Sequence, residues 1–220
     1  MNASSQSSSY YPIFLNIHQK KCIVVGGGEV ARRKVEALLE RGAIVQVIAP
    51  TLCSKLSPLA ESKTISVLLR NYEPGDLKDA LIVIAATTET ETNKKVAMEA
   101  KRRGILVNVV DDREQSGFIV PSCLRRGDLT IAIATAGRSP ALARKIRARL
   151  EKEFGKEYAD LANLIGEVRS DLKKRRVKVN ASIWQDALDL DQLIEMMRAG
   201  QIEKAKTTLL NNLKKQIKGK

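Results

Sequence analysis

Short apolar runs alternate with amphipathic stretches along the first half of the chain. Runs rich in apolar and β-branched residues occupy positions 22–25, 43–48, 64–69, 81–86 and 105–110. The run at 81–86 is apolar throughout, which is typical of a parallel strand buried on both faces. Residues 29–41 and 92–103 lie between such runs, carry apolar positions at helical spacing and end before a glycine. This β-α-β order predicts an open parallel sheet with helices packed on it.

The parallel order stops after residue 112, and a short β segment follows. Residues 118–121 and 129–135 are predicted as two strands, with residues 125–128 as the turn between them. At the other end of the chain, residues 13–17 precede the first strand of the sheet. They are predicted as a short strand or an extended arm.

The last third of the chain has an almost entirely helical pattern. Ser139 and Pro140 predict the start of a long helix, because serine is a good N-cap and proline suits the first helical position. Breaks between helices are expected near Gly155, residues 177–182 and Gly200. We therefore expect an α/β fold followed by a small β segment and a helical domain.

Three consecutive glycines join the first predicted strand to the first predicted helix. Gly26, Gly28 and Ala31 form the pattern G-x-G-x-x-A, which in this strand–loop–helix context indicates dinucleotide binding by a Rossmann-like sheet. Gly26 can make the tight turn, and Gly28 lets the backbone approach a pyrophosphate at the helix N-terminus. The alternative is a glycine-rich turn in another kind of α/β protein.

Small or polar residues stand at the predicted carboxyl ends of two neighbouring strands, where open parallel sheets bind ligands. Ala86 and Thr87 end one run, and Asn108, Asp111 and Asp112 end the next. A carboxylate such as Asp111 can take a proton when hydride leaves a substrate. The spacing equally allows Asp111 to cap the following turn.

The end of the second predicted strand bears on the kind of cofactor. Rossmann sites for NAD often place an acidic residue there, but this strand ends at Pro50 and Thr51, with neither an acid nor an arginine beside them. The local sequence therefore does not distinguish NAD from NADP.

A second candidate anion site lies before the long helix. Thr135, Arg138 and Ser139 form the loop that enters this helix, and Arg144 follows on it. Helix-start N–H groups and cations can hold carboxylates, but an ordinary capped basic helix has the same sequence.

Composition narrows the class of protein. The net charge of +13 fits a nucleic-acid binder, an enzyme for an anionic small molecule or a solvated basic surface. Basic stretches lack interleaved aromatic residues, so a nucleic-acid binder is the weakest of the three interpretations.

The sequence also bears on where the protein resides. No apolar run is long enough to cross a bilayer, no secretory signal is present, and the three cysteines are widely spaced. We therefore expect a cytoplasmic protein without membrane contact. The single histidine, His18, excludes a multi-histidine metal site, and no metal ligands are predicted.

Several segments together resemble one family. Besides the glycine loop and its helix start, they occupy residues 11–15, 85–87, 108–111, 118–122 and 137–143. In this order and at these intervals they resemble precorrin-2 dehydrogenase, the NAD-dependent module of siroheme synthases. The resemblance covers residues 10–150 closely and the helical tail only in general character.

The resemblance implies oxidation of precorrin-2 to sirohydrochlorin with NAD as hydride acceptor, in a homodimer built through the central β segment. The family's key aspartate falls on Asp111, and its cofactor contacts point to Gly26, Gly27, Gly28, Glu29, Val30, Pro50, Thr51, Ala86, Thr87 and Asn108. A residue that is often serine in the family is Thr135 here. The anionic tetrapyrrole gives Arg138, Ser139 and Arg144 a role in substrate binding, and the basic charge a cause.

The expected division of the chain follows from the resemblance. It comprises a disordered tail over residues 1–10, a Rossmann-like NAD-binding domain over residues 11–116, a central dimerisation segment over residues 117–145 and a helical domain over residues 146–220. Two other functions stay open at this point. One is a dehydrogenase that also inserts iron into sirohydrochlorin. The other is an NAD-sensing regulatory module, which would need no carboxylate facing the nicotinamide.

Overall fold

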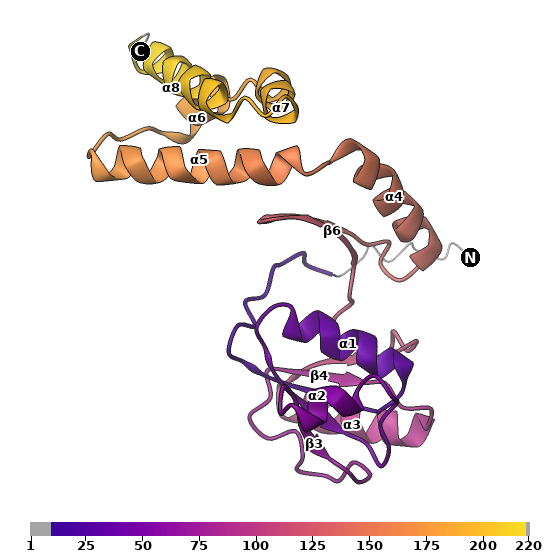
Figure 1. Ribbon diagram of the computed structural model, residues 1–220. Helices are drawn as coiled ribbons and strands as arrows, with labels where there is room; N and C mark the ends of the chain where they lie inside the picture. Colours follow the sequence, from indigo (N-terminus) through magenta and orange to yellow (C-terminus); the bar gives the residue numbers. More distant parts are fainter. Residues whose placement is uncertain (1–9, 219–220) are drawn as a thin grey trace. The chain divides into compact units, whose positions relative to one another are not determined.

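The computed structural model describes residues 10–218 (Figure 1). The predicted tail over residues 1–10 thus lies outside the described residues except for Tyr10. The chain forms two compact units, Met1–Val120 and Pro121–Lys220. The first contains the parallel sheet, and the second contains a β-hairpin and five helices in its described part.

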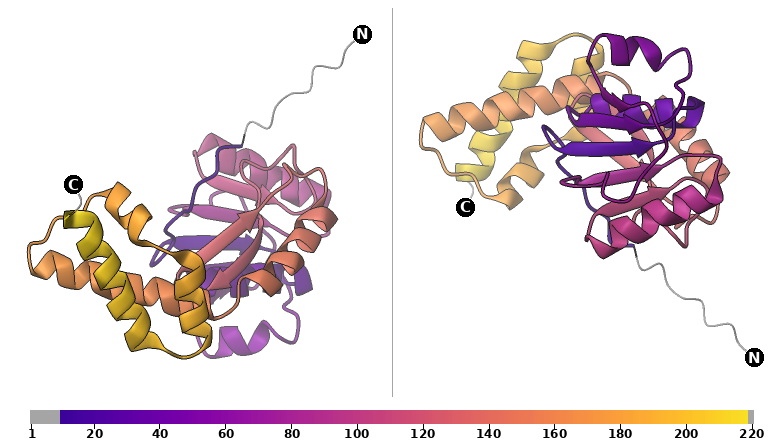
Figure 2. Two further views of the ribbon diagram at one scale, coloured as in Figure 1. Left: turned by 90° about the horizontal axis from the view of Figure 1, so that it is seen from above. Right: turned by 90° about the horizontal axis from the view of Figure 1, so that it is seen from below.

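A parallel sheet of five strands forms the centre of the first unit, in the order β3-β2-β1-β4-β5. Every neighbouring pair is parallel, and the strands lie side by side in Figure 2. The strands are β1 (Lys21–Val25), β2 (Ile44–Ile48), β3 (Ser66–Leu68), β4 (Ile82–Ala85) and β5 (Leu106–Val109). All four residues of β4 are buried, as its uninterrupted apolar run predicts. The predicted open parallel sheet is confirmed.

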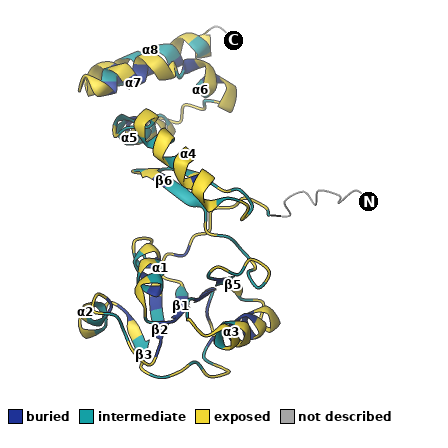
Figure 3. Ribbon diagram, turned by 90° about the vertical axis from the view of Figure 1, so that its right-hand side faces the viewer, coloured by how far each residue is buried: buried dark blue, intermediate teal, exposed yellow. Residues whose placement is uncertain are grey.

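Helices cover both faces of this sheet because successive strand residues point to opposite sides. Helices α1 (Glu29–Leu39) and α2 (Ser57–Glu61) pack on the face that includes Cys22 and Val24. Helix α3 (Thr90–Arg102) packs on the face that includes Ile23 and Val25. Figure 3 shows the buried strands in dark blue between α1 and α3. The short helix α2 was not predicted from the sequence.

The segment ahead of β1 is an extended arm, since residues 10–17 form no strand. Its apolar side chains are largely exposed, with Tyr11 at 85% and Phe14 at 76% of full exposure. The arm ends at a turn in which the Gln19 N–H donates to the carbonyl of Gly42, 2.8 Å away. His18 is exposed in the same turn, remote from the carboxyl ends of the strands.

The second unit begins with an antiparallel hairpin of β6 (Ser122–Arg126) and β7 (Leu129–Ile133). The turn consists of Gly127 and Asp128, and Gly127 has φ +56°, the left-handed region that glycine adopts without strain. The predicted strand over residues 118–121 is therefore wrong. The turn predicted over residues 125–128 is confirmed at Gly127 and Asp128 only, because β6 extends through Arg126.

The physical reason lies in contacts within the first unit. The Asn108 side-chain amide donates to the carbonyl of Phe118 at 3.0 Å, and the Gly117 N–H donates to the carbonyl of Val107 at 2.8 Å. Phe118 also packs against the core beneath α1. These contacts bind the segment beside β5, and the hairpin starts only after Pro121, which has no N–H to give to a ladder.

Five helices complete the second unit: α4 (Pro140–Glu153), α5 (Glu157–Lys174), α6 (Ala181–Ala187), α7 (Leu190–Arg198) and α8 (Ile202–Lys218). Figure 1 shows α6, α7 and α8 gathered on one side of α5, and their shared core includes Leu164, Leu193 and Leu209. The three predicted breaks are confirmed. A further break separates α6 from α7, where the Asp189 carboxylate caps α7 by accepting from the Gln192 N–H at 3.1 Å. In the part of the chain that the structure describes, no helix is both long and apolar enough to traverse a bilayer.

Candidate functional site

A cleft of about 440 Å³ lies at the carboxyl ends of β1, β2 and β4 in the first unit. It is at the switch point of the sheet, where the connections from neighbouring strands β1 and β4 run to opposite faces. Its lining includes Gly26, Gly27, Gly28, Pro50, Thr51, Cys53, Asn71, Tyr72, Ala86, Thr87, Glu89 and Thr92.

Two glycines of the loop are required by the packing of the protein itself. Gly26 has φ +127°, and a Cβ on it would lie 2.5 Å from the carbonyl oxygen of Ala86. A Cβ on Gly27 would lie 1.9 Å from the carbonyl oxygen of Thr51. Because real Cβ atoms do not approach backbone so closely, the loop can lie against both strand ends only with glycine at these positions.

Gly28 is different, because nothing lies within 4 Å of the place where its Cβ would stand. Its φ of −85° is one that any residue adopts, and it is the N-cap of α1 without a side chain to cap the helix. The first N–H groups of α1 therefore face open space instead of a capping oxygen. This cradle fits a pyrophosphate, which a helix N-terminus attracts through its dipole and free donors.

Glu29 and Val30 follow on α1 and are outside the residues that line the cleft. The Glu29 carboxylate accepts from Arg32 Nε at 2.8 Å, and this hydrogen bond lowers the pKa of Glu29. Arg32 also pairs with Glu36. The charges at the start of α1 are thus largely paired with one another.

The loop after β4 is held by side chains at the start of α3. The Thr87 hydroxyl lies 2.9 Å from Asn93 Oδ1, and the Asn93 amide donates to the Thr87 carbonyl at 3.0 Å. Thr87 therefore lines the cleft and also shapes the loop. Asn93 was not identified from the sequence, since one polar residue on a helix gives no signal.

Asp111 follows β5 and is exposed, with φ +59°. Within residues 10–218 its carboxylate accepts no hydrogen bond, whereas Asp112 Oδ1 accepts from the Gln115 N–H at 3.0 Å. Turn capping, the alternative role considered for Asp111, is thus performed by Asp112. Burial and the charge of Arg33 lower the pKa of Lys34 on α1, and the negative charge of Asp111 opposes this shift.

The second candidate anion site belongs to the second unit. The Ser139 N–H donates to the Thr135 hydroxyl at 2.9 Å, and the Ser139 hydroxyl accepts from the Leu142 N–H at 3.2 Å. Both hydroxyls thus build the turn and cap α4, as the capping interpretation predicts. Arg138 and Arg144 are exposed and form no ion pair in the described part of the chain.

Several cleft residues were missed from the sequence, among them Cys53, Asn71 and Tyr72, and also Glu89 and Thr92 at the start of α3. Asn71 and Tyr72 come shortly after β3, and Cys53 follows the strand end at Thr51. The rule that ligands bind at the carboxyl ends of parallel strands points to both segments. No residue-level motif marks them.

Comparisons with known proteins agree with this geometry. Residues 13–122 match the family model described as "Putative NAD(P)-binding", and residues 126–153 match the model "Sirohaem biosynthesis protein central". The siroheme synthase of Chromobacterium violaceum is 43% identical over 182 residues, which are 82% of this chain and 39% of that protein. The siroheme synthase of Vesicomyosocius okutanii is 37% identical over 209 residues, covering 93% of this chain and 45% of that protein.

The chain thus spans less than half the length of these curated relatives. A solved structure named "SirC, precorrin-2 dehydrogenase" has the same fold, with a TM-score of 0.69 and 23% identity over 95% of this chain and 100% of that chain. The relatives confirm the resemblance that the sequence motifs indicate. Because the first family model matches half of the residues and the glycine cradle lies within it, the chain belongs to the NAD(P)-binding family.

Proposed function

We propose that this chain oxidises precorrin-2 to sirohydrochlorin, with NAD as hydride acceptor, in siroheme biosynthesis. The observation that carries the proposal is the open cradle at Gly28 in a chain whose relatives are siroheme synthases. The named activity of the structural neighbour agrees with it. The proposal is for dehydrogenase activity alone, in preference to the chelatase and sensing alternatives.

The cleft supports NAD over NADP. A 2′-phosphate needs a cation, but no arginine or lysine lines the cleft within residues 10–218. Arg70 follows the end of β3, beside the cleft residues Asn71 and Tyr72, and it binds both carboxylate oxygens of Asp76, at 2.7 and 2.8 Å. Its guanidinium is therefore committed to a structural ion pair.

The chain's own residues orient the cofactor and receive the proton. When bound, NAD supplies the acceptor for the hydride. The cradle at Gly28 would hold the pyrophosphate, and the cleft residues at the ends of β2 and β4 would hold the two halves of the dinucleotide on either side of it. Asp111 follows β5, and its carboxylate, which accepts no hydrogen bond among the described residues, takes the proton that the macrocycle loses together with the hydride. The substrate thus gives up two electrons and two hydrogen nuclei, one as hydride and one as a proton.

Residues of the second unit bind the substrate and form the dimer in this proposal. Arg138 and Arg144 bind carboxylates of the tetrapyrrole, and Thr135 and Ser139 contribute to this site by shaping the loop and the capped helix start that carry the two arginines. The chain acts as a homodimer through the central segment over residues 117–145. The hairpin supports this, because β6 and β7 pair only with each other in the described residues and leave their outer edges open.

The test is incubation of the intact protein with precorrin-2 and NAD, followed by the absorption spectrum of sirohydrochlorin. Asp111→Asn should lower kcat by roughly 100- to 10,000-fold, because the amide cannot take the proton, and should leave the Kd for NAD unchanged. Asp112→Asn is the matched control, since asparagine also caps a turn. Normal turnover by Asp111→Asn would remove the proposed base, and no product from the wild type would remove the function.

A further inference from the structure

The loop between β3 and β4 brings two side chains to the cleft without being a helix or strand itself. Asn71 and Tyr72 line the cleft, and residues 69–81 contain only turns and irregular backbone. Leu77 and Ala80 bury the far part of this loop in the core under α3. The part that carries Asn71 and Tyr72 needs other contacts to hold its position.

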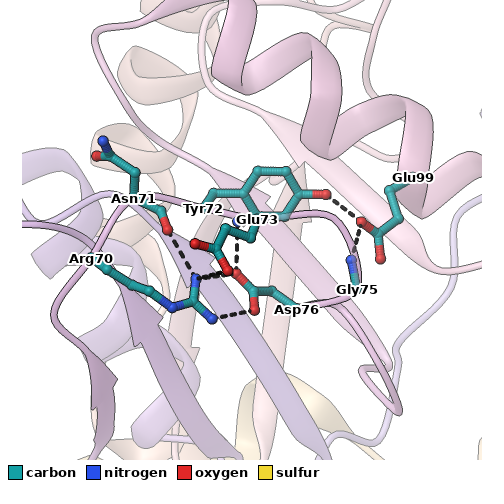
Figure 4. A network of polar contacts seen from close by, with 7 residues as sticks. All are labelled: Arg70, Asn71, Tyr72, Glu73, Gly75, Asp76 and Glu99. Carbon is teal, nitrogen blue, oxygen red and sulfur yellow. Dashed lines mark hydrogen bonds and ion pairs between the residues drawn. The ribbon is translucent and has the colours of Figure 1, made fainter.

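Glu99 supplies the first of these contacts from α3. It is 3% exposed and is the one charged or polar residue that is buried among the described residues. Its Oε2 accepts from the Tyr72 hydroxyl and from the Gly75 N–H, the latter at 2.9 Å. Figure 4 shows the Tyr72 hydroxyl directed at this carboxylate. Arg103 Nε lies 2.8 Å from the other oxygen, Oε1.

Burying an ionised carboxylate costs much folding free energy unless the carboxylate is paired with a cation and hydrogen-bonded. Burial alone would raise the pKa of Glu99, but the Tyr72 hydroxyl, the Gly75 N–H and Arg103 together hold it below its usual value. Burial and the Glu99 carboxylate in turn raise the pKa of Tyr72. The pair is therefore a carboxylate with a neutral phenol, a charge-assisted hydrogen bond.

A second set of polar contacts links residues within the same loop. Arg70 binds Asp76 through both of its terminal nitrogens and donates to the carbonyl of Asn71 at 2.9 Å. The Glu73 N–H donates to Asp76 at 2.8 Å. Residues 70–76 are thus one hydrogen-bonded unit, and Glu99 ties this unit to α3 (Figure 4).

The place of the loop in the sheet indicates which half of a dinucleotide it meets. In Rossmann-like sheets the pyrophosphate binds over the glycine loop after the first strand, and the ribose next to the adenine binds at the end of the second strand. The loop after β3 is one strand further in the same direction, because β3 neighbours β2. Asn71 and Tyr72 are therefore on the adenosine side, opposite to Asp111.

We propose that Glu99 is a positioning residue for cofactor binding, which holds Tyr72 as the wall against which the adenine base lies. The inference rests on the proposed function, since it takes NAD as the ligand of the cleft. A tyrosine ring offers a flat apolar face to a base while its hydroxyl keeps a polar partner. When that partner is lost, the fraction of molecules with the loop in place falls, and the observed Kd rises in proportion.

The decisive variant is Tyr72→Phe in the full chain, because it retains the ring and removes only the hydroxyl. We expect the Kd for NAD, measured by titration calorimetry, to rise roughly tenfold. The KM for NAD should rise in parallel, while kcat at saturating NAD and the KM for precorrin-2 stay unchanged. AMP should lose affinity by the same factor, and nicotinamide mononucleotide should not, because the loop meets only the adenosine half.

Two variants on α3 complete the test. Glu99→Gln keeps an acceptor oxygen for both donors, so its Kd for NAD should rise by less than about threefold. Glu91→Gln is the control, since Glu91 is exposed on the same helix and forms an ion pair with Lys94, which does not line the cleft. Its Kd should equal that of the wild type.

The outcomes separate this inference from the function on which it rests. If the wild type has no affinity for NAD, the proposed function fails, and this inference with it. If the wild type binds NAD and Tyr72→Phe binds it within about twofold, only the positioning role is wrong. Equal losses for AMP and nicotinamide mononucleotide would also overturn the role, since they indicate a general loss of structure.

Discussion

Gly26, Gly27 and Gly28 stand next to one another in the chain, but they are glycines for different physical reasons. At the first two, a side chain would collide with the backbone of neighbouring strand ends. At Gly28 the protein leaves the space open, and its backbone angles suit any residue. The need for glycine there comes from the pyrophosphate that we propose to bind at the start of α1.

This distinction yields a prediction for Gly28→Ala. The variant should fold as the wild type does, with the same melting temperature, because its methyl group meets no protein atom. Its Kd for NAD should rise about ten- to a hundredfold, because the methyl group occupies the volume of the phosphate oxygens. Calorimetric titration with NAD and a thermal melt measure both effects.

Gly166→Ala is the matched control for this prediction. Gly166 is exposed on α5, and its added Cβ would also meet nothing within 4 Å. Alanine in a helix interior should stabilise the second unit by up to about 1 kcal/mol and leave NAD binding as it was. An undiminished affinity of Gly28→Ala for NAD would show that no phosphate lies in the cradle.

At the scale of elements, helix α3 has two structural roles: it packs on the sheet, and it holds the loop after β3. Val96, Ala97 and Ala100 pack into the core on the sheet, which is the amphipathic pattern visible in the sequence. Glu99 lies between these positions and ties the loop after β3 to the helix. The helix thereby connects the packing of the sheet to the wall of the cleft.

Glu99 and Asp76 make the stability of the first unit sensitive to acid. The pKa of Glu99 is lowered as described above, and the pKa of Asp76 is lowered first by the hydrogen bonds from Arg70. Because these pKa values are lower in the folded protein than in the unfolded chain, the two carboxylates stabilise the fold at pH values above the ordinary range of carboxylate pKa values. That stabilisation is lost as the pH falls through the lowered values. We expect the thermal midpoint to be level between about pH 7 and 5 and to fall below about pH 4.

Circular dichroism melts of the wild type and Glu99→Gln measure this effect. The variant should have a lower melting temperature than the wild type at pH 7. Its melting temperature should fall less as the pH is lowered, because it no longer has the carboxylate to protonate. Trp184, the one tryptophan of the chain, lies on α6 and reports the second unit separately by fluorescence. Parallel acid curves for the two proteins would show that Glu99 does not contribute.

At the scale of the whole molecule, the net charge of +13 has a chemical meaning if the substrate is a tetrapyrrole with many carboxylates. The potential of the whole surface then raises the rate of encounter, and particular cations fix the orientation. Some basic residues form ion pairs within the protein, as Arg147 does with Glu151. Arg138 and Arg144 have no such partner in the described residues and stand at the start of α4.

Arg138→Ala should therefore raise the KM for precorrin-2 about five- to tenfold, with the Kd for NAD unchanged, because a charge-assisted contact to a carboxylate is lost. The wild-type KM should also rise with ionic strength, more steeply than that of the variant. Steady-state kinetics at two salt concentrations measure both effects. Arg147→Gln is the control, and an unchanged KM for Arg138→Ala would show that this arginine does not meet the substrate.

Local patterns predicted most of the fold because they depend on short-range physics. Strands that are buried on both faces must be apolar, helices on a sheet need an apolar stripe, and glycine ends helices. The prediction was wrong at residues 118–121, where an apolar run looks like a strand. Its hydrogen-bonding partners are Asn108 and Val107, close in space through the turn after β5, and no pattern in the sequence shows this pairing.

The sequence by itself determined the parallel sheet, the glycine loop, the breaks between helices and the candidate residues at the strand ends. Only the tertiary structure decided that Asp112 caps the turn while Asp111 stays free of it, and that Glu99 holds Tyr72 at the cleft. Periodicity specifies which face of an element is buried. It does not specify which polar group meets another across elements that are far apart in the chain, because that depends on how the core packs.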